Sequence, residues 1–317
     1  MTATVGVLGA SGETGRLVTR LLAEHADARL VLLGRRPEPL ERLRAGLPDP
    51  GRAEVRRADA TRRDEFGTAL RGVGVVVVTA PVLDRLDVVL ATVLDAGADW
   101  IDVLLDGRAK GDVLASHAPR IAAERRCVVT GAGLHPGLAA VLVRAVASRF
   151  DVLARARVAQ LIAADWAGYE FSAEAMVEFT RELTAYDASG LVNREWRTLP
   201  WWRATTVDFG TPFGRRACAP MGLEELRRLP ERLPGLTDAT LLMAGFNPVS
   251  DWLVMPAAMA MTLVSPRLAG PAAHLLVASL RRFGRPPYGS VAQVVGEGTG
   301  HAPVRLSVRH GDGGYWL

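Results

Sequence analysis

The sequence predicts an α/β protein with a doubly wound parallel sheet, followed by a second α+β domain whose sheet is mostly antiparallel. Two observations predict the first part: short apolar strands alternate with helices, and a glycine-rich turn joins the first strand to the first helix. Such alternation implies right-handed βαβ units in one sheet. Near residue 150 the pattern changes to longer strands, prolines and separate helices. We therefore expect domains at 1–152 and 153–317.

Six strands and five helices are expected in the first half. Runs of apolar and β-branched residues predict strands at 5–8, 30–33, 53–57, 73–78, 100–103 and 127–130. Apolar residues recurring three or four positions apart predict helices at 12–24, 37–45, 62–70, 86–96 and 115–124. Pro37 in a first turn and Gly46 after a last turn are typical helix boundaries. The valine run at 73–78 fits a central strand that is buried on both faces.

The second half is expected to open with a long strand at 153–163 and a helix at 172–186 with Ser172 as its N-cap. Prolines and three tryptophans (Trp196, Trp201 and Trp202) mark strands and long loops at 190–235. Helices are expected at 236–244, 256–263 and 271–283, and antiparallel strands at 291–297 and 304–310. The chain ends directly after a strand, so either a final helix lies beyond Leu317 or the protein is short.

Composition excludes several classes of function. Of the 317 residues, 49% are hydrophobic and 23% charged, which is ordinary for a soluble globular protein. No apolar run approaches the roughly 20 residues that cross a bilayer, and the N-terminus shows no export signal. The net charge of +4 comes from arginines spread along the chain, without the basic stripe of a nucleic-acid binder. We expect a cytoplasmic protein without a nucleic-acid or membrane partner.

The two cysteines support the same view. Cys127 lies in a strand-like run, and Cys218 is expected in a loop. Neither a CxxC pair nor a Cys/His cluster is present, so we expect no metal site and no disulfide framework.

The glycine-rich turn predicts a dinucleotide site. It runs GxxGxxG through Gly9, Ala10, Ser11, Gly12, Glu13, Thr14 and Gly15. In Rossmann domains the first such glycine allows a tight turn, the second a close approach of the pyrophosphate, and the third close packing of helix on strand. The helix N-terminus then offers N–H groups to the phosphates. The alternative is a glycine-rich turn that only packs a helix on a sheet.

The end of the second strand favours NADP(H) over NAD(H). An NAD site usually places Asp or Glu here to bind the ribose 2′-hydroxyl. This chain has Gly34-Arg35-Arg36, and two guanidinium groups suit a 2′-phosphate. Alternatively, one arginine stacks on adenine and the other is solvated.

Three further loops follow strands at the same edge of the sheet, where ligands bind in doubly wound folds. Asp59 is expected near the adenine. Thr79, Ala80 and Pro81 are expected near the pyrophosphate or the nicotinamide ribose. A loop that includes Gly131 and Gly133 is expected beside the nicotinamide ring.

With these motifs in hand, the sequence resembles the saccharopine dehydrogenase-like reductases. The resemblance rests on GASGETGR at 9–16, GRR at 34–36, the Thr79-Ala80-Pro81 loop, AGADWID at 96–102 and GAGLHPGL at 131–138. The second half matches only in outline. The resemblance implies an NAD(P)-dependent oxidoreductase, often acting on an imine, with a second domain that binds a small-molecule substrate and carries homodimer contacts. Saccharopine itself is not expected as substrate, because residues 156–317 show no arginine cluster for its carboxylates.

Catalytic candidates follow from position. His135 lies beside the expected ring and can donate a proton near neutral pH, although the family commonly has Phe or Asp there. The alternative is that His135 is a structural turn residue before Pro136. Asp165, Trp166 and Tyr169 follow the first strand of the second domain and are expected at the crevice, with Tyr169 as an acid. Their alternative is surface packing. The function expected is hydride transfer to or from a C=N, C=O or C=C bond; the alternative is a redox sensor or accessory protein without hydride chemistry.

Overall fold

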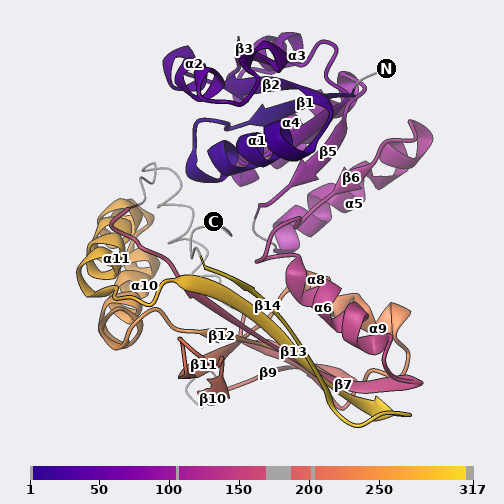
Figure 1. The fold of residues 1–317 in the computed structure, drawn as a ribbon, viewed down its shortest axis with the longest axis vertical. Helices are drawn as coiled ribbons and strands as arrows, with labels where there is room; N and C mark the ends of the chain where they lie inside the picture. Colours follow the sequence, from indigo (N-terminus) through magenta and orange to yellow (C-terminus); the bar gives the residue numbers. More distant parts are fainter. Residues whose placement is uncertain (1–2, 105–106, 169–186, 201–203, 312–317) are drawn as a thin grey trace. The chain divides into compact units, whose positions relative to one another are not determined.

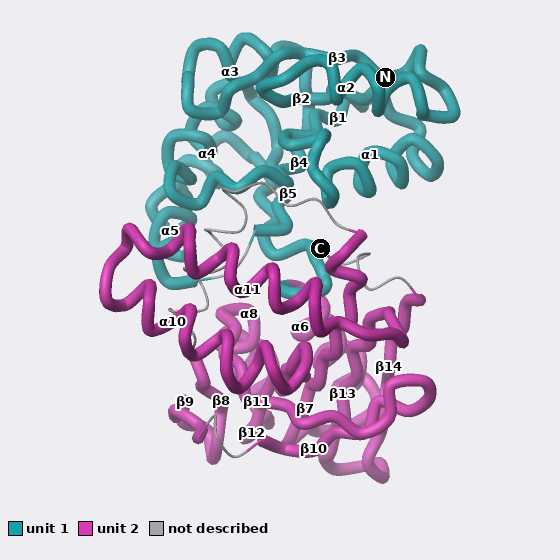
Figure 2. The backbone as a smooth tube through the Cα atoms, turned by 90° about the vertical axis from the view of Figure 1, so that its left-hand side faces the viewer, with its two compact units in different colours: residues 1–136, 317 teal, residues 137–316 magenta. Residues whose placement is uncertain are grey.

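The computed structural model describes residues 3–104, 107–168, 187–200 and 204–311 (Figure 1). The chain divides into two compact units between Pro136 and Gly137 (Figure 2). This division precedes the boundary expected at 152/153. Helix α6 (Leu138–Ala147) belongs to the second unit because its buried residues, Leu142 and Val146 among them, join the core of that unit.

The first unit is a parallel sheet in the order β3-β2-β1-β4-β5-β6. All pairings in it are parallel. Its strands are β1 (Ala3–Leu8), β2 (Ala28–Gly34), β3 (Ala53–Arg57), β4 (Val75–Val78), β5 (Asp99–Asp102) and β6 (Val128–Val129). Its helices are α1 (Glu13–His25), α2 (Pro37–Ala45), α3 (Arg63–Ala69), α4 (Leu86–Asp95) and α5 (Arg108–Ala123), with short turns η1 (Pro50–Arg52) and η2 (Leu83–Arg85).

Alternate residues of β2 show that this sheet is covered on both faces. Leu30 and Leu32 join the apolar cluster of α1 and α2. Val31 and Leu33 point the other way, into the cluster of α3, α4 and α5 that includes Phe66. Side chains alternate between the two faces of a strand, so an unbroken apolar strand needs helices on both sides. The doubly wound fold is confirmed.

The second unit is built on a mixed sheet in the order β10-β11-β12-β7-β13-β14, with β8 paired to β12 and β9. Only the β7–β12 pairing is parallel. The strands are β7 (Val152–Ala163), β8 (Ser189–Val192), β9 (Glu195–Thr198), β10 (Thr205–Asp208), β11 (Arg215–Met221), β12 (Asp238–Ala244), β13 (Gly289–Thr299) and β14 (Val304–His310). The helices after α6 are α8 (Glu224–Arg227), α9 (Leu229–Arg232), α10 (Met255–Val264) and α11 (Ala269–Phe283), with turns η3 (Ser250–Val254) and η4 (Pro266–Leu268). A mostly antiparallel second sheet is confirmed.

Two expectations for the second half were wrong. Residues 236–244 are not a helix: 238–244 form β12, a strand paired on both sides by β11 and β7. A short apolar run is equally typical of a buried strand and of a buried helix. Here hydrogen bonding to the neighbouring strands shows that the run is a strand. Cys218 lies in β11 rather than in a loop, and burial raises the pKa of its thiol to about 12. The expected helix 172–186, with Ser172, and the indoles of Trp201 and Trp202 lie outside the described residues.

No helix in the described ranges has both the length and the apolar character needed to cross a bilayer.

Candidate functional site

The turn between β1 and α1 is held tightly by two glycines. Gly9 has a φ of +88°, and its N–H donates to Leu33 O on β2 (3.0 Å). A Cβ on Gly9 would lie 2.8 Å from Ala80 N, so the turn is pressed against the loop after β4. A Cβ on Gly15 would lie 2.2 Å from Gly9 O, so α1 rests directly on the turn. These two glycines are required by the packing of the chain itself.

Gly12 is different, and the difference points to a ligand. A Cβ built on Gly12 meets only Gly9 O, at an ordinary contact distance of 3.4 Å. Gly12 is exposed and is the N-cap of α1. The first-turn N–H groups of a helix have no partner within the helix and carry its positive dipole end. Since the fold does not require glycine here, the missing Cβ fits the approach of a diphosphate to these N–H groups.

Polar and charged groups follow β2 and β3 at the same edge. Arg35 and Arg36 are exposed, directly after Gly34 of β2. The Asp59 carboxylate, after β3, accepts hydrogen bonds from Thr61 N (2.9 Å) and Thr61 Oγ1 (2.8 Å). These bonds, together with the positive charge of Arg35, hold the pKa of Asp59 below its ordinary value.

The loop after β4 is joined to the glycine turn. Thr79 N and Thr79 Oγ1 both donate to Leu8 O at the end of β1, each at 2.9 Å. Ala80 lies against Gly9, and Pro81 is exposed. The structure thus places the loop after β4 against Gly9. That this loop lies near the pyrophosphate or the nicotinamide ribose stays a prediction.

The loop after β6 forms a compact turn. Gly131 has a φ of +62°, and Gly133 N donates to Pro136 O (3.0 Å) across a turn that includes His135. His135 is half-buried in it. The turn is anchored to β5 by a group that sequence reasoning did not select.

That group is a buried ion pair at the carboxyl end of β5. The Asp102 carboxylate is fully buried, and the side chain of Lys110, in the first turn of α5, is 2% exposed. Lys110 Nζ lies 2.8 Å from Asp102 Oδ1 and also donates to Leu104 O (2.9 Å). Trp100 Nε1 donates to Asp102 Oδ2 (2.6 Å), and Leu104 N to Oδ1 (3.1 Å).

The same aspartate binds the glycine-rich loop. Thr130 Oγ1 (3.2 Å) and Gly131 N (3.3 Å) both donate to Asp102 Oδ1. Ala132 N donates to Asp102 O (2.8 Å). One residue therefore connects β5, α5 and the first residues of the loop that carries His135. Two sequence signals could have found it: a carboxylate at the end of a buried strand and the only lysine of the chain, eight positions later.

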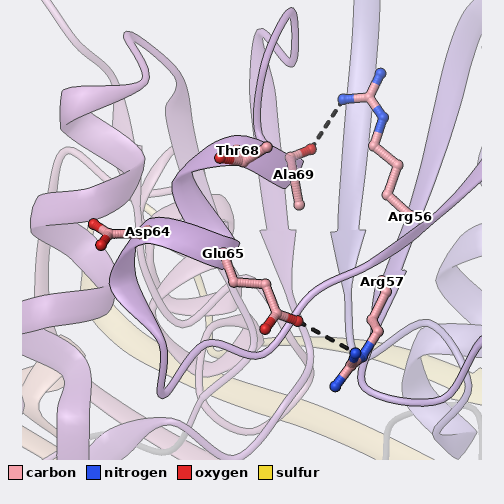
Figure 3. Close-up of a pocket in the computed structure, with 6 residues that line it drawn as sticks. All are labelled: Arg56, Arg57, Asp64, Glu65, Thr68 and Ala69. Carbon is pink, nitrogen blue, oxygen red and sulfur yellow. Dashed lines mark hydrogen bonds and ion pairs between the residues drawn. The ribbon is translucent and has the colours of Figure 1, made fainter.

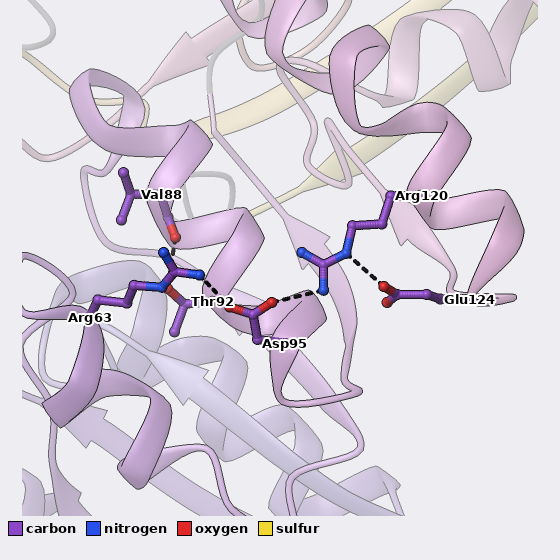
Figure 4. A network of polar contacts seen from close by, with 6 residues as sticks. All are labelled: Arg63, Val88, Thr92, Asp95, Arg120 and Glu124. Atoms are coloured by element: carbon purple, nitrogen blue, oxygen red, sulfur yellow. Dashed lines mark hydrogen bonds and ion pairs between the residues drawn. The ribbon is translucent and has the colours of Figure 1, made fainter.

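Two other clusters of charged side chains in the first unit bind neighbouring groups of the protein itself. Figure 3 shows a surface depression between β3 and α3, where Arg56 Nη1 donates to Ala69 O (2.9 Å) and Arg57 lies 3.7 Å from Glu65. Figure 4 shows Asp95 of α4 between Arg63 (2.7 Å) and Arg120 (2.8 Å), which hold the pKa of Asp95 below its ordinary value. Both arrangements join secondary-structure elements, and we assign no ligand to them.

In the second unit, the predicted candidates follow β7. The exposed Asp165 accepts a hydrogen bond from Ala167 N (3.3 Å), closing a local turn. Trp166 is buried and packs edge-on against Phe246 with a centroid distance of 5.5 Å. Arg281 Nε donates to the Trp166 carbonyl (3.2 Å). Tyr169 lies outside the described residues. No group of three or more His, Cys, Asp or Glu that could hold a metal occurs in the part of the chain described.

Sheet order, glycine turn and carboxyl-end loops together define the first unit as a Rossmann dinucleotide-binding domain. Residues 9–104 match the model of a family described as NAD(P)H-binding. A search of curated proteins found no match to the chain.

Solved structures extend the likeness to the whole chain. Saccharopine dehydrogenase (L-Glu forming) from Saccharomyces cerevisiae has 14% identity and a TM-score of 0.64, covering 97% of this chain and 85% of its own. A myo-inositol dehydrogenase from Corynebacterium glutamicum has 10% identity and a TM-score of 0.48, over 96% and 75% of the two chains. A short-chain dehydrogenase/reductase from Veillonella parvula in complex with NADP has 20% identity and a TM-score of 0.30, over 33% and 48%. The chain thus has a fold like that of saccharopine dehydrogenase, and its residues 9–104 match the NAD(P)H-binding family model.

Proposed function

We propose that this protein is an NADP(H)-dependent oxidoreductase that transfers a hydride to or from a small C=N, C=O or C=C substrate. The observation that carries the proposal is the cradle around Gly12, with two exposed arginines at the end of the neighbouring strand. The N–H groups of the first turn of α1 bind the diphosphate. Arg35 and Arg36 bind the 2′-phosphate through charge-assisted hydrogen bonds.

The nicotinamide, when bound, supplies or accepts the hydride at its C4 carbon. In the reducing direction a new C–H bond forms on the substrate, and the substrate nitrogen, oxygen or second carbon takes a proton. The chain's part is to position the reactants and to deliver that proton. We propose His135 for this proton, and Asp165 and Tyr169 as further groups from the second unit.

Coenzyme preference is tested by calorimetry with NADPH and NADH. Replacing both Arg35 and Arg36 by Ala should weaken NADPH binding by about 100-fold or more, since a charge-assisted hydrogen bond contributes about 1.5–3 kcal/mol. NADH binding should change by less than about threefold, because NADH lacks the 2′-phosphate. The matched control is Arg29→Ala/Arg42→Ala, which removes two other exposed arginines, at the amino end of β2 and on α2. An equal loss for both coenzymes would overturn the assignment.

Hydride transfer is tested by following NADPH oxidation with a panel of imines, ketones and enoyl thioesters. If one class is turned over, and His135→Ala lowers that turnover without loss of NADPH binding, the result supports the proposed role of His135. Tight NADPH binding without turnover of any class favours a redox sensor or accessory protein.

A further inference from the structure

We propose that the Asp102–Lys110 pair is a positioning device for the loop 130–136, and that it sets this loop to receive the nicotinamide half of the coenzyme. The inference rests on the proposed function and deepens it. The order of the strands indicates in which direction the coenzyme extends along the edge of the sheet. The diphosphate site follows β1, and Arg35 and Arg36 follow β2, on one side of β1. The other nucleotide must therefore lie toward β4, β5 and β6, where Asp102 and the loop are found.

The choice of residues supports a specific role. Lys110 is the only lysine among the 38 lysines and arginines of the chain. It is also buried, which is rare for a cation and costly unless the charge is paired. The compact ammonium donates to Asp102 Oδ1 and Leu104 O, whereas the larger planar fork of arginine carries five N–H donors.

Stability alone does not explain the pair. Apolar side chains of similar volume often replace a buried ion pair without loss of stability. They cannot, however, accept hydrogen bonds from Thr130 Oγ1 and Gly131 N, both of which bind Asp102 Oδ1. Asp102 thus holds the start of the loop, and Lys110 compensates the charge that this acceptor brings into the interior.

Two double variants separate these effects. Asp102→Leu/Lys110→Met removes both charges and the acceptor for the loop. Asp102→Asn/Lys110→Met also removes both charges but keeps an acceptor oxygen for Thr130 and Gly131. In both variants the Trp100 indole N–H loses its carboxylate acceptor. The probes are NADPH, which carries the nicotinamide, and 2′,5′-ADP, which carries only the adenosine half with its 2′-phosphate.

We expect the Leu/Met variant to bind NADPH about tenfold or more weakly, because the start of the loop loses two hydrogen bonds. Its affinity for 2′,5′-ADP should stay within about twofold of wild type, because the cradle and the arginines are untouched. The Asn/Met variant should keep most of the NADPH affinity. Nicotinamide fluorescence of bound NADPH should change in the Leu/Met variant only.

Unchanged NADPH affinity and fluorescence in a folded Leu/Met variant would overturn the inference. An equal loss of both ligands would also overturn it, since that result describes a general structural role. Should the Leu/Met variant fail to fold, Thr130→Val tests the same point without touching a buried charge. It should alter nicotinamide fluorescence and leave 2′,5′-ADP binding intact, and no change in fluorescence would refute the inference. Wild-type protein that binds neither ligand would instead refute the proposed function on which the inference depends.

Discussion

Alanine substitutions at Gly12 and Gly15 should affect different properties: Gly15→Ala should lower the stability of the fold, and Gly12→Ala should weaken coenzyme binding. At Gly15 the new Cβ would meet Gly9 O at 2.2 Å and Ala10 Cα at 2.7 Å. Both are backbone atoms that cannot move aside without displacing α1 from the turn. Overpacking of this kind costs about 1–3 kcal/mol. We expect the Tm of Gly15→Ala to fall by several degrees, because roughly 2–4 °C is lost per kcal/mol in a protein of 150–250 residues and somewhat less in a longer one.

At Gly12 the fold should tolerate the methyl group. The nearest atom is 3.4 Å away, and the φ of −75° and ψ of 169° suit alanine. Losing glycine at the N-cap should cost at most about 1 kcal/mol of stability. The methyl group would, however, stand where the diphosphate approaches the amides, and we expect NADPH binding to weaken by about 100-fold.

Thermal unfolding without ligand and calorimetry with NADPH measure the two effects separately. Gly12→Ala should unfold near the wild-type temperature and lose binding, whereas Gly15→Ala should lose stability first. A Gly12→Ala variant that binds NADPH like wild type would show that no diphosphate contacts this turn. A Gly15→Ala variant as stable as wild type would refute the packing argument.

Two other predictions concern the second unit. Burial raises the pKa of Asp251 to about 6, above its ordinary 3.8, so the ionised form destabilises the fold. The contribution of the protonated Asp251 carboxyl to the stability of the fold is therefore complete below about pH 4, and it is lost as the pH rises through 6. Asp251→Asn keeps an oxygen for Phe246 N and should be more stable than wild type at pH 8, by up to about 3 kcal/mol. Urea unfolding at pH 5 and pH 8 measures this gain, and an equal gain at both would contradict it. We also propose a homodimer through the second unit, where Leu263 and Val264 of α10 are 72% and 81% exposed. Light scattering should give twice the chain mass for wild type and one chain mass for Leu263→Glu/Val264→Glu; a monomeric wild type would refute it.

Local signals in the sequence predicted most elements of the first unit. Helix α2 begins at Pro37 and ends at Ala45 as predicted, because a proline and a glycine mark its two ends. The alternation of strands and helices predicted one parallel sheet, and because the carboxyl ends of parallel strands lie at one edge, it also predicted that the loops after β1, β2 and β4 lie there. The glycine turn required no information beyond its spacing and its flanking strand and helix.

Features that depend on contacts between distant segments were missed. Strand β12 was predicted as a helix because its apolar run carries no period that separates the two structures. The pairing of Asp102 with Lys110, Thr130 and Gly131 joins three segments, and no sequence spacing predicts the contacts of Asp102 with Thr130 and Gly131. The chemistry of these residues became visible only once the fold had placed them together.

The burial of the only lysine has a practical consequence. Reagents that acylate primary amines should leave Lys110 unmodified in the folded protein, because this single side-chain amine is shielded within the first unit. A lysine-specific protease likewise has one possible cleavage site in the whole chain. The rate of acylation or cleavage at that position would therefore report how often the segment around α5 opens to solvent. Coenzymes that protect the segment should slow both reactions.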